Sequence, residues 1–135
     1  MTTTTTTKRL QVMVLDDERI VGQTLKPALR KLGCDVETFR EPRVAFERIE
    51  EKEFDIVVTD ILMDDIDGIQ VLERVLERWP RTRVIMITGY AMMEMARRAM
   101  EKGAFDFVAK PFTPDDLRAV VARAAADLGV PVEEG

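Results

Sequence analysis

The sequence feature that most constrains the fold is an apolar segment that leads directly into acidic residues. Residues 54–58 are rich in β-branched side chains and are interrupted only by Asp55. A short apolar run of this kind is typical of a strand that is buried on both faces, as in a parallel sheet. Asp60 follows, and the residues from there to Gly68 are acidic and turn-like. The pattern therefore predicts a rigid strand that delivers the Asp60 carboxylate to the rim of a sheet.

Similar apolar segments alternate with segments of helical spacing along the rest of the chain. Gly33 and Gly103 are placed as helix stops, and Thr113 followed by Pro114 is a strong helix start. Pro27 falls inside the first helix, where it should kink the chain at a cost of about 3 kcal/mol. The predicted strands are 11–15, 35–39, 54–58, 83–88 and 104–108, and the predicted helices are 21–32, 42–49, 71–79, 91–102 and 114–128.

Five alternations of strand and helix, joined by short loops, predict a single doubly wound α/β domain. Its sheet should have five parallel strands, right-handed crossovers and helices on both faces. The strand order 2-1-3-4-5 is favoured, because it brings the ends of the first and third strands together at the switch point. We place this domain at residues 9–128, after a disordered, threonine-rich leader at 1–8 and before a tail or the start of a linker at 129–135.

The composition argues against several functional classes. The chain has 25 acidic and 20 basic residues, and its net charge of −5 argues against binding to nucleic acid or to an anionic membrane. It contains no histidine, which excludes the usual zinc sites and the histidine-based catalytic triads. Cys34 is the only cysteine, so we expect it to be a packing residue in a reducing, cytoplasmic environment. No segment is long and apolar enough to span a membrane.

Polar side chains follow the ends of four predicted strands. Asp16 and Asp17 come after the first strand, Asp60 after the third, Thr88 ends the fourth, and Lys110 follows the fifth. Each acid alone could be a solvated strand cap, but the ends of parallel strands share one edge, so we expect these side chains to converge. Carboxylates about 5 Å apart repel by about 3 kcal/mol per pair, so the cluster predicts a divalent cation, Mg²⁺ or alternatively Mn²⁺. Beside that cation, Asp60 can act as a nucleophile toward phosphorus.

These residues belong to motifs whose order and spacing are specific. The motifs are Val14–Glu18, Val58–Met63, Met86–Gly89 and Phe107–Phe112. Together they resemble the receiver domain of two-component response regulators, and the resemblance extends from Leu10 to about Leu128. The chemotaxis protein CheY of this family has the strand order 2-1-3-4-5, so that order is not an independent prediction.

The resemblance implies a role for each acidic residue of the cluster. Asp60 is expected to accept a phosphoryl group from a phosphohistidine on a sensor histidine kinase or on a histidine phosphotransfer protein. Asp17, Asp60 and the main-chain carbonyl of Leu62 are expected to hold Mg²⁺. Asp16 is expected to contribute to the metal site through a water molecule.

The resemblance also implies a conformational switch. Thr88 and Lys110 are expected to bind the phosphoryl oxygens, and inward movement of Thr88 lets the Phe107 side chain turn from exposed to buried. This change would reshape the surface of the fourth helix, fifth strand and fifth helix, which controls a downstream partner or effector domain and can also serve a homodimer. The Lys110–Pro111 peptide bond is expected to be cis.

Three features depart from the usual pattern or add to it. Asp64 occupies a position that is usually proline, so the loop should be more mobile and more negative, although a solvated turn residue is the simpler interpretation. Leu62 and Tyr90 are expected to flank the phosphoryl group and to hinder attacking water, which predicts a phosphorylated state that lasts minutes or longer. Four methionines crowd the fourth helix, either as core residues or as an adaptable output or dimer surface; they are Met92, Met93, Met95 and Met100.

Three functions compete on the sequence alone. The leading hypothesis is a phosphorylation-dependent switch, which is not a turnover enzyme and shows only self-phosphorylation from small donors and slow self-dephosphorylation. A hydrolase that uses an aspartyl phosphate needs a second acid two residues after the nucleophile, where this chain has Leu62. An interaction module that keeps the fold without phosphorylation is the remaining alternative, and the complete set of site residues argues against it. Both a stand-alone domain and the first domain of a larger regulator fit the sequence.

Overall fold

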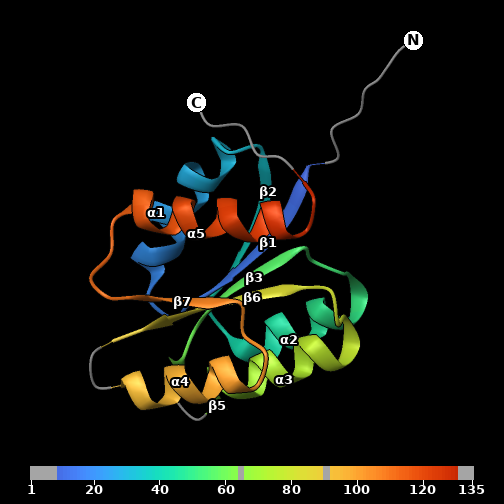
Figure 1. Cartoon of the computed structure of the whole chain (residues 1–135), viewed down its shortest axis with the longest axis vertical. Helices are drawn as coiled ribbons and strands as arrows, with labels where there is room; N and C mark the ends of the chain where they lie inside the picture. Colours follow the sequence, from blue (N-terminus) through green and yellow to red (C-terminus); the bar gives the residue numbers. More distant parts are fainter. Residues whose placement is uncertain (1–8, 64–65, 90–91, 131–135) are drawn as a thin grey trace.

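The main sheet of the computed structural model has five parallel strands (Figure 1). The structure describes residues 9–63, 66–89 and 92–130. The strands are β1 (Leu10–Leu15), β2 (Cys34–Phe39), β3 (Ile56–Asp60), β6 (Arg83–Thr88) and β7 (Asp106–Ala109). Their order in the sheet is β2-β1-β3-β6-β7, which confirms the predicted order 2-1-3-4-5. β1 and β3 therefore lie side by side, and their carboxyl ends share one edge.

Within the described residues, five helices cover the two faces of this sheet (Figure 1). α1 (Arg19–Arg30) and α5 (Pro114–Asp127) pack on one face, and α2 (Pro42–Glu51), α3 (Gly68–Arg78) and α4 (Met93–Glu101) pack on the other. Thr113 begins α5 with a capping box to Asp116, as its sequence predicted. No described helix is long and apolar enough to cross a membrane.

The hydrophobic core forms two layers, one on each side of the sheet. Strand residues divide between the layers because successive side chains point to opposite faces. Val12 and Val14 belong to the layer under α1 and α5, whereas Met13 and Leu15 belong to the layer under α2, α3 and α4. The central strands are thus buried on both faces, as their apolar sequences predicted.

The segment around Asp60 differs from the sequence prediction in two ways. β3 begins at Ile56 and includes Asp60, because Asp60 pairs in register with Ile87 of β6. The following segment, expected to be only a turn, contains a short antiparallel pair, β4 (Leu62–Met63) and β5 (Ile66–Asp67). Asp60 is therefore fixed by the sheet itself, and the described residues 62–63 and 66–67 form strands where only a turn was expected.

Gly68 allows the start of α3 to pack against the end of β3. Its N–H donates to the Ile61 carbonyl at 2.7 Å. A Cβ atom at position 68 would lie 2.5 Å from the carbonyl oxygen of Asp60 and 2.7 Å from the Cα of Ile61. These are backbone atoms of the strand end that carries the candidate site, so a side chain at this position would displace them.

Candidate functional site

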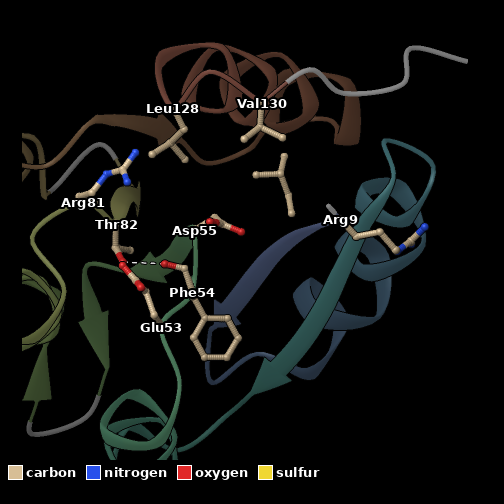
Figure 2. A pocket seen from close by; sticks show the side chains of 9 residues that line it. Arg9, Glu53, Phe54, Asp55, Arg81, Thr82, Leu128 and Val130 are labelled. Atoms are coloured by element: carbon tan, nitrogen blue, oxygen red, sulfur yellow. Dashed lines mark hydrogen bonds between the residues drawn. The ribbon is translucent and has the colours of Figure 1, made fainter. Parts of the chain in front are cut away.

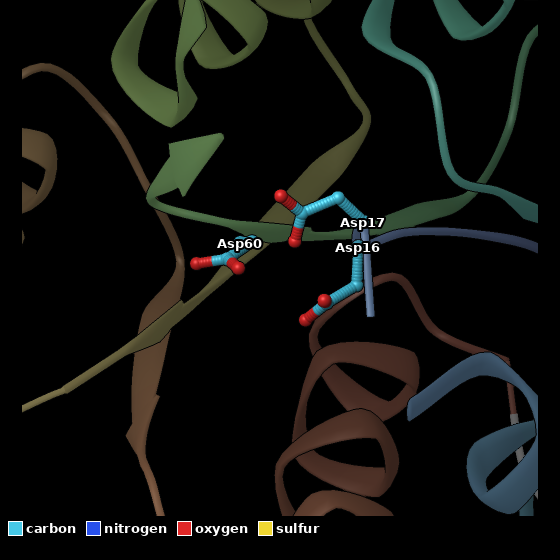
Figure 3. A group of neighbouring side chains, drawn as sticks. All are labelled: Asp16, Asp17 and Asp60. Carbon is cyan, nitrogen blue, oxygen red and sulfur yellow. The ribbon is translucent and has the colours of Figure 1, made fainter. Parts of the chain in front are cut away.

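Three aspartates lie together at the carboxyl edge of β1 and β3 (Figure 3). Asp16 and Asp17 directly follow β1, and Asp60 is the last residue of β3. One carboxylate oxygen from each of them lies within 4.8 Å of the other two. They converge because β1 and β3 are neighbours at the point where the strand order reverses.

Asp16 is almost fully buried, with 2% of the residue exposed. Its Oδ1 accepts a hydrogen bond from the Glu18 N–H at 2.8 Å, whereas its buried Oδ2 has no hydrogen-bond partner among the described residues. Burial raises the pKa of Asp16 to about 6; the hydrogen bond from Glu18 opposes this effect, and the charge of Asp60 adds to it. A buried carboxylate oxygen without a partner is unfavourable, and a nearby cation with its bound water would satisfy it.

One carboxylate oxygen of Asp60 accepts a main-chain hydrogen bond, and the other lies near the ammonium group of Lys110. Oδ1 accepts a hydrogen bond from the Leu62 N–H at 3.2 Å, and Oδ2 lies 3.7 Å from Nζ of Lys110. Burial raises the pKa of Asp60, although the Leu62 N–H and the Lys110 ammonium act in the opposite direction. The side chain is 13% exposed, so the carboxylate is not sealed from solvent.

Lys110 brings an ammonium group to this edge from the end of β7. Its Nζ lies 3.5 Å from Oδ2 of Asp16 and 3.7 Å from Oδ2 of Asp60, but its hydrogen bond goes to Oε1 of Glu18. Burial lowers the pKa of Lys110, but the bond to Glu18 and the charges of Asp16 and Asp60 outweigh it, so the pKa is raised overall. The ammonium is therefore held as a cation among acids.

Glu18 was not among the predicted site residues. Its only signal in the sequence is its position directly after Asp16 and Asp17. The contact with Lys110 joins residues 92 positions apart, and it depends on how the end of β7 packs beside the start of α1. Sequence spacing alone could not have identified this pair.

Thr88 and Phe107, the residues predicted to switch, lie on neighbouring strands. Thr88 ends β6, is 1% exposed, and its Oγ1 donates to the Gly89 carbonyl at 3.1 Å. Phe107 is half-buried in β7 and packs against the core layer under α2, α3 and α4. The Lys110 N–H donates to the Thr88 carbonyl at 2.6 Å, and the Lys110–Pro111 peptide bond is cis, as expected.

Leu62 follows Asp60 closely, and its side chain is 49% exposed. Asp64 and Tyr90, for which the sequence also gave predictions, lie outside the described residues. The expected effects of these three residues on the loop and on attacking water therefore stay predictions.

The residues at this edge fit a small, hard divalent cation. The three clustered side chains all offer carboxylate oxygens, and Asp16 Oδ2 has no hydrogen-bond partner among the described residues. Mg²⁺ takes one or two carboxylates from a protein and keeps several waters, which suits a site of this size. Chemically, the arrangement can hold such a cation and place the Asp60 carboxylate beside both it and an ammonium.

A second hollow, at the opposite edge of the sheet, lacks this chemistry (Figure 2). It has a volume of about 180 Å³ and is lined by residues that include Arg9, Asp55, Thr82 and Val130. Two of its polar side chains already have partners: Thr82 Oγ1 donates to the Phe54 carbonyl at 2.6 Å, and the Asp55 carboxylate accepts a main-chain N–H. The candidate site is therefore the aspartate cluster.

Comparisons with known proteins agree with this geometry. Residues 12–122 match the family model described as the response regulator receiver domain. The response regulator protein PilR of Pseudomonas aeruginosa is 33% identical over 116 residues, which cover 86% of this chain and 26% of PilR. The chain spans about a quarter of the length of the curated relatives it matches.

Solved structures show the same fold. A response regulator receiver domain protein from Clostridium thermocellum has a TM-score of 0.83 at 29% identity, and the match covers 89% of this chain and 97% of that one. The beryllofluoride-activated NtrC4 receiver domain dimer has a TM-score of 0.80 at 32% identity, with coverages of 87% and 97%. On this evidence the chain belongs to the response regulator receiver domain family.

Proposed function

We propose that this chain is a phosphorylation-dependent switch in which Asp60 accepts a phosphoryl group from a phosphohistidine on a sensor histidine kinase or a histidine phosphotransfer protein. The observation that carries the proposal is the position of the Asp60 carboxylate, which lies between two other aspartates and the Lys110 ammonium. An Asp60 oxygen forms the new bond to phosphorus as the phosphorus–nitrogen bond breaks. The leaving imidazole keeps the electron pair of that bond and takes up a proton.

Each neighbouring residue has a defined part in this proposal. Asp17, Asp60 and the main-chain carbonyl of Leu62 would hold Mg²⁺, with Asp16 acting through a water molecule; Mn²⁺ could replace Mg²⁺. When bound, the cation would offset negative charge on the phosphoryl oxygens. Lys110 and the Thr88 hydroxyl would bind the remaining oxygens and orient the group for transfer.

The signal would leave through the surface of α4, β7 and α5. Thr88 and Phe107 lie on the adjacent strands β6 and β7, so a movement of the Thr88 hydroxyl can reach this surface by a short path. Met93 and Met100 of α4 are exposed at 40% and 37%, which suits an adaptable partner surface. The NtrC4 receiver was solved as a beryllofluoride-activated dimer, which supports a homodimer here. The curated relatives are about four times as long as the match, which supports an effector domain as the other partner.

A docking place for the phosphodonor is offered by a groove between α1 and the loop after β7. The groove has a volume of about 480 Å³, and its walls include Ile20, Leu25 and Phe112 as well as Glu18 and Lys110 of the site. Ile20 is 67% exposed, the most exposed of the large apolar side chains in the described residues. Since Asp60 and this groove share Lys110 as a boundary, an apolar helix of the donor protein seated here would hold its phosphohistidine near Asp60.

We place the receiver at residues 9–128 as one domain of a longer regulator, because the matched relatives are about four times as long as the match. The downstream process then belongs to the rest of that regulator. The single cysteine and a kinase as donor support a cytoplasmic location. An interaction module that works without phosphorylation remains the alternative.

The test is to incubate the protein with Mg²⁺ and acetyl phosphate and to measure the intact mass. One phosphoryl adduct that disappears in Asp60→Asn, and that fails to form in EDTA, is the expected result. Absence of an adduct would favour the module without phosphorylation. Mass is a better readout than Trp79 fluorescence, because Trp79 ends α3 at the sheet edge opposite Asp60 and its Nε1 is bonded to the Ile49 carbonyl.

A further inference from the structure

Glu18 holds Lys110, a site residue that must change partners during the proposed reaction. Among the described residues, Lys110 has three acids within ion-pair distance, and of these only Glu18 accepts a hydrogen bond from it. The Asp16 and Asp60 oxygens lie at 3.5 Å and 3.7 Å, beyond a well-formed N–H···O bond. The ammonium thus donates to Glu18 while it stays within ion-pair distance of Asp16 and Asp60.

The Glu18 side chain has no hydrogen-bond partner besides Lys110 among the described residues. It stands at the N-cap position of α1 in an extended conformation, yet its side chain makes no capping hydrogen bond. Its carboxylate is 57% exposed, and its contact with Lys110 crosses from the start of α1 to the end of β7. An N-cap residue normally satisfies the free N–H groups of the first helical turn, so this glutamate gives up the usual function of its position.

We propose that Glu18 is a positioning residue, which holds the Lys110 ammonium off Asp60 until a phosphoryl group competes for it. This inference rests on the proposed function of Asp60. Without Glu18, the ammonium would pair with Asp60 and Asp16 in the resting state and compete there with the cation. After phosphorylation, the same ammonium would bind the phosphoryl oxygens without first leaving Glu18.

This role of Glu18 predicts that its loss shifts the affinities for Mg²⁺ and for beryllofluoride in opposite directions. Loss of the Glu18 contact should weaken Mg²⁺ binding, because Lys110 then occupies the aspartates. At saturating Mg²⁺ it should strengthen binding of beryllofluoride, which stands in for the phosphoryl group on Asp60. Each shift should be about three- to five-fold, the range that a partly exposed ion pair supports.

Three variants distinguish the effect of the Glu18–Lys110 contact from the effect of the negative charge of Glu18 and from a general effect on the fold. Glu18→Gln removes the charge and the ion pair, whereas Glu18→Asp keeps the charge but is one methylene too short to hold Lys110 in place. Glu41→Gln is the matched control: Glu41 is the N-cap of α2, at the carboxyl edge of the same sheet, and likewise makes no side-chain capping bond. Mg²⁺ and beryllofluoride affinities are measured by titration with ¹H–¹⁵N NMR spectra of the folded proteins.

The expected result is that Glu18→Gln and Glu18→Asp both bind Mg²⁺ more weakly and beryllofluoride more tightly, while Glu41→Gln matches the wild type. If Glu18→Asp behaves as the wild type, the negative charge alone matters and the positioning role is wrong. If both affinities fall together in the Glu18 variants, the residue is merely structural and the proposal is also overturned. A wild-type protein that binds Mg²⁺ but not beryllofluoride would instead overturn the proposed function of Asp60.

Discussion

Replacing Asp16 by asparagine should make the metal-free protein more stable at neutral pH, although it removes a site residue. The side chain is buried, its Oδ2 has no hydrogen-bond partner among the described residues, and burial raises its pKa from 3.8 to about 6. One pKa unit corresponds to about 1.4 kcal/mol, so the ionised carboxylate costs the folded, metal-free protein about 3 kcal/mol at pH values well above 6. Asparagine removes that cost and can keep the hydrogen bond from the Glu18 N–H.

The sign of the pH dependence follows from the raised pKa. The protonated form of Asp16 favours the folded state, so its contribution to stability is complete below the unfolded pKa of 3.8 and is lost as the pH rises through about 6. Asparagine does not titrate. The two proteins should therefore be similarly stable near pH 4, and Asp16→Asn should be more stable by about 2 to 3 kcal/mol near pH 8.

Urea unfolding in EDTA, followed by Trp79 fluorescence, measures this difference. Trp79 packs against the core layer under α2, α3 and α4, so it reports unfolding. Asp35→Asn is the control, because hydrogen bonds from Gln11 and Arg9 lower the pKa of Asp35, and its replacement should reduce stability near pH 8. Added Mg²⁺ should stabilise the wild type more than Asp16→Asn. An Asp16→Asn protein less stable than the wild type in EDTA near pH 8 would refute the reasoning.

Three further predictions concern other parts of the domain. Gly68→Ala should lower the free energy of unfolding by about 2 kcal/mol, because its Cβ would lie 2.5 Å from the Asp60 carbonyl oxygen. Gly22→Ala in α1 is the control: the nearest neighbour of its Cβ would be 3.4 Å away, so this variant should be neutral or slightly stabilising. Equal effects of the two variants in urea unfolding would contradict this prediction. Ile20→Glu should slow phosphoryl transfer from a phosphohistidine protein about ten-fold and leave labelling by acetyl phosphate unchanged, and a loss in both mass assays would remove the docking role. The phosphorylated wild type should decay over minutes or longer because Leu62 and Tyr90 are expected to hinder attacking water, so a half-life of seconds would show that this shielding is absent.

The sheet could be predicted from sequence because its central strands are apolar on both faces. Val57 and Val58 of β3, for example, belong to opposite core layers. Successive apolar residues of this kind are typical of a strand that is covered by helices on both faces of the sheet. The meeting of Asp16 and Asp17 with Asp60 followed from the same reasoning, since parallel strands end at one edge.

Details that depend on register were less predictable. The predicted strand 54–58 lies two residues before the observed β3, because pairing with β6 decides where the strand ends and Asp60 has a partner there. The short β4–β5 pair rests on two residues in each strand, which is too few for an alternating pattern to be visible in the sequence. The need for glycine at position 68 could not be predicted either, because it depends on the short distance between this position and the Asp60 backbone.

The charges at this edge explain why a cation should precede the phosphoryl group. Among the described residues, Lys110 lies within ion-pair distance of Asp16, Asp60 and Glu18, and Asp17 adds a fourth carboxylate to this edge. Phosphorylation would replace the single charge of Asp60 by about two, and like charges about 5 Å apart repel by about 3 kcal/mol per pair in a partly buried site. Lys110 alone cannot offset that excess of negative charge while its ammonium is also paired with Glu18. A bound cation would therefore be needed to offset the charge of the phosphorylated site, and under our proposal Glu18 would increase that need by keeping the Lys110 ammonium engaged.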